Sequence, residues 1–156
     1  MAQINTYTGA YVSGMKVGQL VVAHDTATGD VDKTITVPAN RLWRIVLVWL
    51  LLDTSGNAGF RHIRLTVHLP GGAIFGQSWY DASTTLNTVD QYLWADQIEE
   101  SAMIETDSLL SHYWSPLPCL WMPAGFYFRL WENDAVDPAN DVMPVAVTAI
   151  EYAPNP

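Results

Sequence analysis

Val37-Pro38-Ala39-Asn40, which leads into the run Arg41-Leu42-Trp43-Arg44-Ile45, recurs in altered form later in the chain. The second copy is Met122-Pro123-Ala124-Gly125, and it leads into Phe126-Tyr127-Phe128-Arg129-Leu130. In each copy, proline and a small turn residue stand directly before an extended stretch of aromatic and aliphatic side chains. This arrangement is typical of a chain that turns corners into long strands. The pair therefore predicts an all-β fold.

The run after the first corner, residues 41–52, is predicted to be a strand with two apolar faces. One face would carry Trp43, Ile45, Leu47, Trp49 and Leu51. The other face would carry Val46, Val48, Leu50 and Leu52. A strand that is apolar on both faces is covered on both faces. The opposite sheet supplies one cover, and an N-terminal arm, a loop or another subunit supplies the second.

Turn signals divide the rest of the chain into short extended segments. We predict strands at 33–37, 60–69, 73–80, 109–114, 117–122, 126–132 and 142–152. Residues 88–103 are the best helix candidate, and we predict a long loop there with at most one helical turn. Seven or eight strands separated by turns and long loops are typical of a β-sandwich, and the preferred topology is a jelly roll.

The strand at 60–69 alternates well and is predicted to be half exposed. Its inward residues would be Ile63, Leu65, Val67 and Leu69. Its outward residues would be His62, Arg64, Thr66 and His68.

We divide the chain into residues 1–32, an N-terminal arm or one to two short strands, and residues 33–156, the β-sandwich domain. The first segment is rich in Gly, Thr, Ser and Asp, and an arm of this kind packs along its own domain or along a neighbour. Met1–Thr6 has no basic n-region or apolar h-region, so we expect no signal peptide and synthesis in the cytoplasm. The strongest apolar run is far shorter than the ~20 residues of a membrane-spanning helix, so no membrane is expected.

The composition favours a protein that buries surface against partners. Apolar residues make up 49% of the chain and charged residues 15%, below the roughly 25% of typical domains. Such a chain is expected to hide part of its surface against a partner, the alternative being a compact monomer with a large core. The net charge is −9, and the chain has two lysines, Lys16 and Lys33. Because affinity for nucleic acid rests on Lys and Arg, we expect no binding to nucleic acid.

Two groups of residues are weighed as metal ligands. The histidines are His24, His62, His68 and His112. The second and third lie about 20 Å apart on one strand face and do not share an ion, so we expect surface or interface histidines. The loop 133–141 carries Asp134, Asp137, Asn140 and Asp141, whose oxygens suit Ca²⁺. This loop lacks the Gly and the closing Glu of an EF-hand, so the pattern favours a solvated turn, with calcium as the weaker alternative.

Motifs for catalysis are missing from the sequence. It contains no Gly-x-Ser-x-Gly, phosphate-binding Gly loop or Cys/His dyad. An acidic cluster, Glu99, Glu100, Glu105 and Asp107, could supply the two carboxylates of a glycosidase, but it fits a solvated loop more simply. The single cysteine, Cys119, excludes an intrachain disulfide and is expected to be a small buried hydrophobe. We predict no enzymatic activity and no cofactor.

Aromatic side chains are the main candidates for an interface, because Trp and Tyr dominate binding hot spots. They also stack on sugar rings in carbohydrate-binding modules. Core packing is expected for Trp43 or Trp49. The interface candidates are Tyr7, Tyr11, Trp79, Tyr80, Tyr113 and Trp114, of which the last four stand beside loops and are expected to be partly exposed.

Four segments, Thr34–Ile45, Arg61–Val67, Leu120–Leu130 and Asp134–Ile150, together resemble small virion proteins of tailed bacteriophages. The resemblance covers residues 33–152 and implies a β-sandwich accessory protein of the particle, a head decoration (cement) protein. Such proteins commonly form trimers over the capsid lattice. It therefore implies a virion location, a homo-oligomer, and the major capsid protein or other virion subunits as partners. The alternative is a tail or fibre component that recognises carbohydrate or a receptor through exposed Trp and Tyr.

Overall fold

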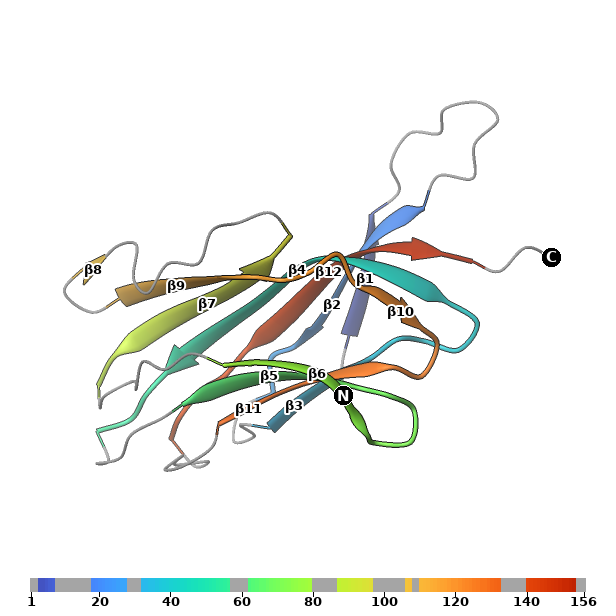
Figure 1. Ribbon diagram of the computed structural model, residues 1–156. Helices are drawn as coiled ribbons and strands as arrows, with labels where there is room; N and C mark the ends of the chain where they lie inside the picture. The colour runs from blue at the N-terminus through green and yellow to red at the C-terminus, as the bar shows by residue number, and fades with distance from the viewer. Residues whose placement is uncertain are drawn as a thin grey trace.

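The computed structural model describes residues 3–7, 18–27, 32–56, 62–79, 87–96, 106–107, 110–132 and 140–153. These residues form strands and turns and no helix, and the strands make two facing layers (Figure 1). The strands are β1 (Gln3–Tyr7), β2 (Gln19–Asp25), β3 (Asp32–Thr36), β4 (Leu42–Asp53), β5 (Ile63–His68), β6 (Ile74–Trp79), β7 (Val89–Ala95), β8 (Thr106–Asp107), β9 (Leu110–Pro116), β10 (Trp121–Pro123), β11 (Tyr127–Glu132) and β12 (Val145–Tyr152).

The order of the strands confirms the predicted jelly-roll sandwich. The larger sheet runs β1-β2-β12-β4-β7-β9-β8, with β10 also paired to β4, and the smaller sheet runs β3-β11-β5-β6. If strands 2 to 7, 11 and 12 are lettered B to I, the two sheets read B-I-D-G and C-H-E-F, which is the jelly-roll order. β9 adds to this frame in parallel with β7, and the other described pairs are antiparallel.

The two Pro-Ala corners carry the chain between the sheets in opposite directions, and they lie side by side. The first leads from β3 to β4 and the second from β10 to β11. The Val37 amide donates to the Phe126 carbonyl at 2.9 Å, and the Gly125 amide donates to the Val37 carbonyl at 3.1 Å. Each corner ends in a residue with positive φ, Asn40 at 57° and Gly125 at 81°. These residues stand third in the turns that begin at Pro38 and Pro123, where a type II turn requires positive φ. The prediction that the chain turns these corners into strands is confirmed, because the first corner leads into β4, of 12 residues, and the second into β11, of 6 residues.

The described part of residues 1–32 forms the two short strands that were one of the two expectations. β1 pairs with β2 from Gln3–His24 to Tyr7–Leu20, and β2 pairs with β12 along its length. Val21 and Ala23 of β2 are buried in the core. The hydrogen-bond ladder therefore crosses the division at residue 33, and β2 belongs to the sandwich.

A β-bulge in β4 overturns the predicted sidedness of that strand. Thr148 of β12 pairs with Leu47 and Ala149 pairs with Ile45, so Val46 is an extra residue. Because side chains alternate along a strand, one extra residue moves the next ones to the other face. The residues that point into the core are therefore Trp43, Ile45, Val48, Leu50 and Leu52. Leu47, Trp49 and Leu51, expected beside Trp43, lie on the outer face.

Two other segments differ from expectation. The region 88–103 was predicted to be a loop with a helical turn, but its first part is β7, paired with both β4 and β9. Asp90, Tyr92 and Trp94 alternate inward along it, so the pattern has the period of a strand. In β5, the inward residues Ile63, Leu65 and Val67 are confirmed. The outward residues Thr66 and His68 are also buried, because neighbouring side chains cover that end of the strand.

The side chain of Lys33 is buried between the two sheets. It lies on the inward side of β3 between the solvent-facing Asp32 and Thr34, and it is 0% exposed. Its Nζ donates to the Ala27 carbonyl at 2.6 Å and lies 3.7 Å from Asp25 Oδ1. A buried ammonium group needs such partners, because loss of water around the charge is costly. Lys33 therefore fixes the end of β2 in the larger sheet against β3 in the smaller one.

The second corner gives a direct test of backbone strain. Gly125 has a φ of +81°, and a Cβ there would lie 3.3 Å from Pro70 Cγ. We predict that Gly125→Ala lowers the free energy of unfolding by about 1–2 kcal/mol, because an L side chain disfavours positive φ. Gly71→Ala is the matched control, since nothing lies within 4 Å of its Cβ position. Urea denaturation measures both, and an unchanged midpoint for Gly125→Ala would contradict the role of the turn.

Candidate interaction face on the larger sheet

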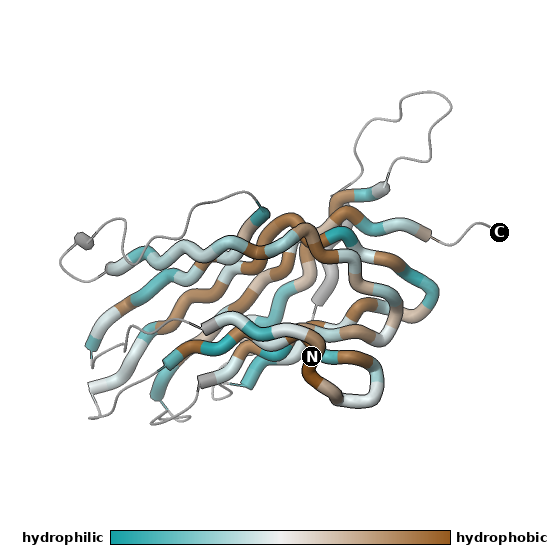
Figure 2. Tube along the Cα trace, in the orientation of Figure 1, coloured by the Kyte–Doolittle hydropathy of each residue, from teal (hydrophilic) through white to brown (hydrophobic). Residues whose placement is uncertain are grey.

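The outward side of the larger sheet is mostly apolar, and we call this surface the outer face. In one row, the register places Trp114 beside Leu93, Leu93 beside Trp49, and Trp49 beside Ala146, and the row ends at His24 on β2. The next row is built from Pro116, Ala95, Leu47, Thr148 and Val22. Five strands at about 4.8 Å spacing make this surface about 20 Å wide. Figure 2 shows the apolar residues concentrated along β4 and β12 in the middle of the sheet.

Large exposed side chains flank these rows on the same side of the sheet. Trp121 on β10 is 48% exposed and packs on Tyr152 with ring centroids 5.5 Å apart. Val46 is lifted out at the bulge, and Leu20 lies on β2 beside Ile150. Trp114, at the β9 end of the first row, is 37% exposed. The bulge thus places Leu47, Trp49 and Leu51 outside, where an unbroken strand would place Val48, Leu50 and Leu52.

Charge is confined to the margins of this surface. Among the outward positions of the described strands β2, β12, β4, β7 and β9, the charged residues are Arg44 and Asp53, near opposite ends of β4. Arg44 lies 4.0 Å from Asp96, so it has a partner within the chain. Interface cores are depleted in charged residues in the same way. The outer face can therefore bury apolar area without burying unpaired charge.

The opposite surface of the sandwich has a different character. On the smaller sheet, Arg129 of β11 makes a bidentate ion pair with Asp32 of β3, the shortest contact being 2.6 Å. The hydrogen bonds that Arg129 donates to Asp32 raise the pKa of Arg129 above its usual value. The guanidinium groups of Arg64 and Arg129 lie 5.2 and 4.7 Å from the Trp131 ring. This charged, paired surface contrasts with the outer face of the larger sheet.

The structure separates the predicted interface candidates. Trp114 is exposed on the outer face, as expected. Tyr113 was expected to be partly exposed, but it is buried, because alternation along β9 turns it inward. Tyr11 and Tyr80 lie outside the described residues, as do the side chains of Tyr7 and Trp79. Sequence reasoning missed Trp121, Leu93 and Leu47, whose placement depends on the register of distant strands.

Tyr113 stacks in an aromatic group within the sandwich. Its ring lies 5.0 Å from that of Tyr92, which in turn lies 6.2 Å from Trp94. Burial, and then the negative charge of the nearby Asp90, raise the pKa of Tyr113 above its usual value of 10.0, while a hydrogen bond with Ser111 lowers it. The indole of Trp94 donates to Ser78 Oγ at 3.2 Å and so links this group to β6 of the other sheet.

Two expectations about single side chains are wrong. His68, expected at the surface, is buried and stacks on Tyr127 with ring centroids 4.6 Å apart. Its ring nitrogens lie 2.9 Å from Thr66 Oγ1 and 3.0 Å from the Gly72 carbonyl, so they brace the β5–β6 hairpin. Cys119, expected to be buried, is exposed, because it lies in the link between β9 and β10 and outside the core. His24, His62 and His112 are half-buried.

The calcium candidates are only partly within the structure. Asp134 and Asp137 lie outside the described residues. Asn140 is exposed, whereas Asp141 is buried and its Oδ1 accepts the Ser55 amide at 2.6 Å. This bond joins Asp141 to a backbone amide 86 residues away in the sequence, so Asp141 is a buried long-range partner of Ser55 and does not bond its own backbone as in the predicted solvated turn. In the part of the chain that the structure describes, no group of three His, Cys, Asp or Glu side chains is placed to hold a metal ion.

Tyr113 gives a pH-dependent prediction. A raised pKa in the folded state means that the unfolded chain loses this proton first, so the contribution of Tyr113 to stability is complete below pH 10 and falls above it. We predict that Tyr113→Phe reduces the loss of stability between pH 9 and pH 11 relative to the unmodified chain. Urea denaturation across this range measures the effect, with Tyr152→Phe as the half-buried control. Equal pH dependence in all three proteins would contradict the placement of Tyr113.

Asp141 gives a test that distinguishes its hydrogen bond with the Ser55 amide from a metal site. Asp141→Ala leaves the Ser55 amide without its partner and should cost about 1–3 kcal/mol of unfolding free energy. Asp141→Asn keeps an acceptor oxygen and should cost less. We expect EDTA and added Ca²⁺ to leave the melting temperature unchanged in all three proteins. A rise in melting temperature with Ca²⁺ that Asp141→Asn removes would favour the metal site.

No protein-family model and no curated protein matches this sequence. Among solved structures, the chain is similar to an exo-beta-agarase at a TM-score of 0.35 and 9% identity, covering 99% of this chain and 22% of that one. It is also similar to CapF, solved with the inhibitor 3-isopropenyl-tropolone, at a TM-score of 0.23 and 10% identity, covering 97% and 34%. The chain thus spans a third or less of the proteins it matches, and likeness this low carries no argument about function. No helix able to cross a membrane occurs in the described segments.

Proposed function

We propose that the chain is a structural protein of a bacteriophage particle that decorates the head and binds neighbouring subunits through the outer face. It acts as a homo-oligomer, for which the sequence resemblance implies a trimer. The observation that carries the proposal is the apolar outer face itself, where the charged residues of the described strands β2, β12, β4, β7 and β9 stand near the ends of β4. The protein works by adhesion and needs no cofactor.

The geometry of the outer face supports a packing role over a catalytic one. A flat row of Trp114, Leu93 and Trp49 offers a broad contact surface of the kind that marks protein interaction sites. Its aromatic side chains supply contact area at low cost in conformational entropy. The sandwich beneath it is held by a continuous core, so the surface is rigid before binding. A rigid apolar surface suits a subunit that reinforces a lattice.

A second candidate function is a tail or fibre module that recognises carbohydrate or a receptor. The exposed indoles of Trp114 and Trp121 favour it, because both lie on the same side of one sheet. Flat aromatic rings can stack on sugar rings as well as on protein side chains. The two functions differ in where the chain sits on the particle and in what Trp49 contributes.

The outer face is tested by Trp49→Lys. A lysine at the middle of a buried contact leaves an unpaired charge there, so occupancy on purified particles should fall at least tenfold, a loss of about 1.4 kcal/mol or more. Thr34→Lys, on the exposed side of the smaller sheet, is the matched control and should leave occupancy unchanged. Peptide mass spectrometry of the particles measures occupancy, and electron cryo-microscopy locates the chain.

The outcomes separate the two candidates. Density for the chain on the head lattice, with occupancy lost in Trp49→Lys alone, supports decoration. Equal occupancy for Trp49→Lys and the unmodified chain contradicts the role of the outer face. Density at the tail, together with glycan-array binding that Trp114→Ala and Trp121→Ala remove, favours the carbohydrate or receptor module.

A further inference from the structure

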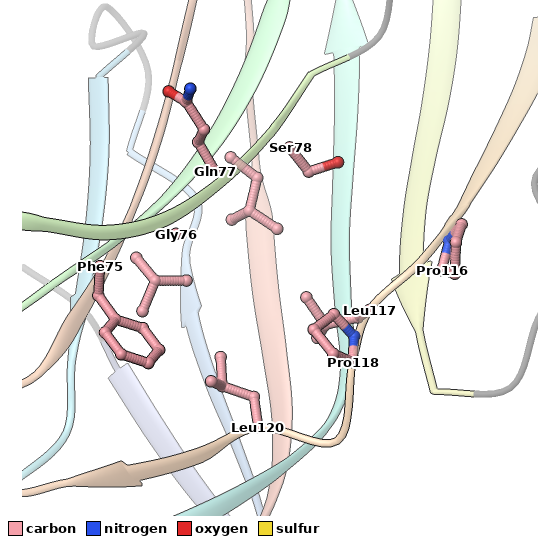
Figure 3. Close-up of a pocket in the computed structure, with 10 residues that line it drawn as sticks. Phe75, Gly76, Gln77, Ser78, Pro116, Leu117, Pro118 and Leu120 are labelled. Atoms are coloured by element: carbon pink, nitrogen blue, oxygen red, sulfur yellow. The ribbon is translucent and has the colours of Figure 1, made fainter.

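A pocket opens at the edge of the smaller sheet, between β6 and the link from β9 to β10. Its volume is about 260 Å³. Phe75, Gly76, Gln77 and Ser78 form one side, and Pro116, Leu117, Pro118 and Leu120 form the other (Figure 3). Leu65 and Val67 of β5 form its floor. A cavity of ~150 Å³ already admits a benzene ring, so this pocket has room for a phenyl side chain.

The strand beside this pocket is an edge without charge or proline. β6 ends the order of the smaller sheet and pairs with β5 alone among the described strands. Charged residues and proline are two of the features that normally prevent edge pairing, and β6 has a third, a bulge, at Phe75. Ile74 and Phe75 are 57% and 61% exposed, the most exposed large apolar side chains of the described residues. An uncharged, apolar edge strand is a template for another strand.

The other sheet edges differ from β6. β3, the opposite edge of the same sheet, carries Asp32 in its ion pair with Arg129 and begins with two charged residues. β8 is two residues long, and β1 consists mostly of polar residues. The residues that line the pocket and the uncharged edge therefore belong to the same strand, β6.

We propose that β6 pairs in antiparallel fashion with β6 of a second copy of this chain, about a two-fold axis at Gln77. In this register Gly76 of each copy lies across from Ser78 of the other, on the face of the sheet that both share. A bulge between Val67 and His68 leaves Phe75 as the extra residue of β6 beside Gly76, which turns its ring toward the pocket. Ser78 is small and faces the pocket, so the phenyl ring of the partner copy would enter it.

Self-pairing fits this strand because the protruding side chain and the pocket lie on the same edge. A two-fold contact is self-complementary, so each copy gives one ring and accepts one. Gly76 brings no Cβ to the contact, and nothing lies within 4 Å of its Cβ position. The two β6 strands can therefore approach each other to the spacing of a sheet.

Charge also favours a second copy, and the area of the contact predicts a weak dimer. Each chain carries a net charge of −9, so two copies repel each other except where a surface lacks acidic residues, as β6 does. The contact consists of two Phe75 rings and two Ile74 side chains, 61% and 57% exposed in the free chain, with the two strand edges, which is less than the ~1,200–2,000 Å² of a standard interface. That is the low end for specific interfaces, so we expect a dimer that depends on concentration.

This contact is separate from the outer face and does not depend on where the chain is located. Two contacts with different symmetry on one chain connect oligomers into larger assemblies. If the outer face builds the oligomer, β6 joins one oligomer to the next.

The test measures mass by light scattering after gel filtration, from about 1 μM to about 1 mM chain, since the dimer is expected to be weak. The mass of the unmodified chain should rise with concentration toward twice that of Phe75→Lys, which should stay constant because lysine places two charges at the contact. Gly76→Val should give the lower mass as well, because its side chain fills the pocket. Thr34→Lys, on the opposite edge of the same sheet, should behave like the unmodified chain.

Gly76→Val also separates loss of pairing from loss of folding. Valine favours extended backbone, and its Cβ meets no atom within 4 Å, so this variant should be at least as stable as the unmodified chain in urea. A folded Gly76→Val that fails to associate supports the pairing. Equal masses for the unmodified chain and Phe75→Lys at every concentration, or association that Trp49→Lys removes and Phe75→Lys leaves intact, would overturn it.

Discussion

The hydrogen bonds between the two Pro-Ala corners fix the rest of the sandwich. Val37 both donates to Phe126 and accepts from Gly125, so the chain crossing from the smaller sheet is bonded to the chain crossing back. These bonds set the register of β3 against β11 on one side, and β4 meets β10 on the other. A slip at either corner would shift both pairings at once. Since a shift of one residue exchanges the two faces of a strand, the corners decide which side chains enter the core.

A carboxylate attaches this pair of corners to the middle of the larger sheet. Glu151 of β12 accepts from the Trp43 indole at 2.8 Å and from Arg41 Nε at 3.1 Å. Arg41 follows the first corner directly, and its amide closes that turn on the Pro38 carbonyl. One side chain on β12 thus orients both the start of β4 and the large ring that fills the end of the core. Both oxygens of the Glu151 carboxylate accept hydrogen bonds, so the partial burial of this charge does not destabilise the fold.

The bulge at Val46 shows where sequence reasoning succeeds and where it stops. Both corners, the alternation of β3 and the inward residues of β5 follow from local pattern and turn chemistry, and they were predicted. The bulge depends on how β12 pairs with β4, which no local pattern in β4 records. Without it, Trp43 and Trp49 fall on one face; with it, Trp43 is in the core and Trp49 is outside. The predicted second apolar face was real, but its membership was not predictable.

The contrast between local sequence pattern and pairing with distant strands also explains the other differences between the predicted and observed structure. In β7, the buried Asp90 interrupts an apolar pattern, although the alternation of Tyr92 and Trp94 was available as a signal for a strand. Tyr113 and Trp114 are neighbours in sequence, and only the pairing of β9 with β7 decides which of them is exposed. The pocket beside β6 is a property of two segments from different sheets. Interaction sites on a sandwich depend on register, and register is set by distant partners.

The place of β12 has a consequence for how the protein is made. This strand lies between β2 and β4 and joins them, although both come much earlier in the chain. During synthesis, the apolar run of β4 therefore has no partner on that side until residues 145–152 leave the ribosome. Sheets closed by such distant pairings fold slowly, and their unpaired edges are prone to aggregate in the meantime. The same central strand that completes the sandwich thus leaves the facing edges of β2 and β4 unpaired for longest during synthesis.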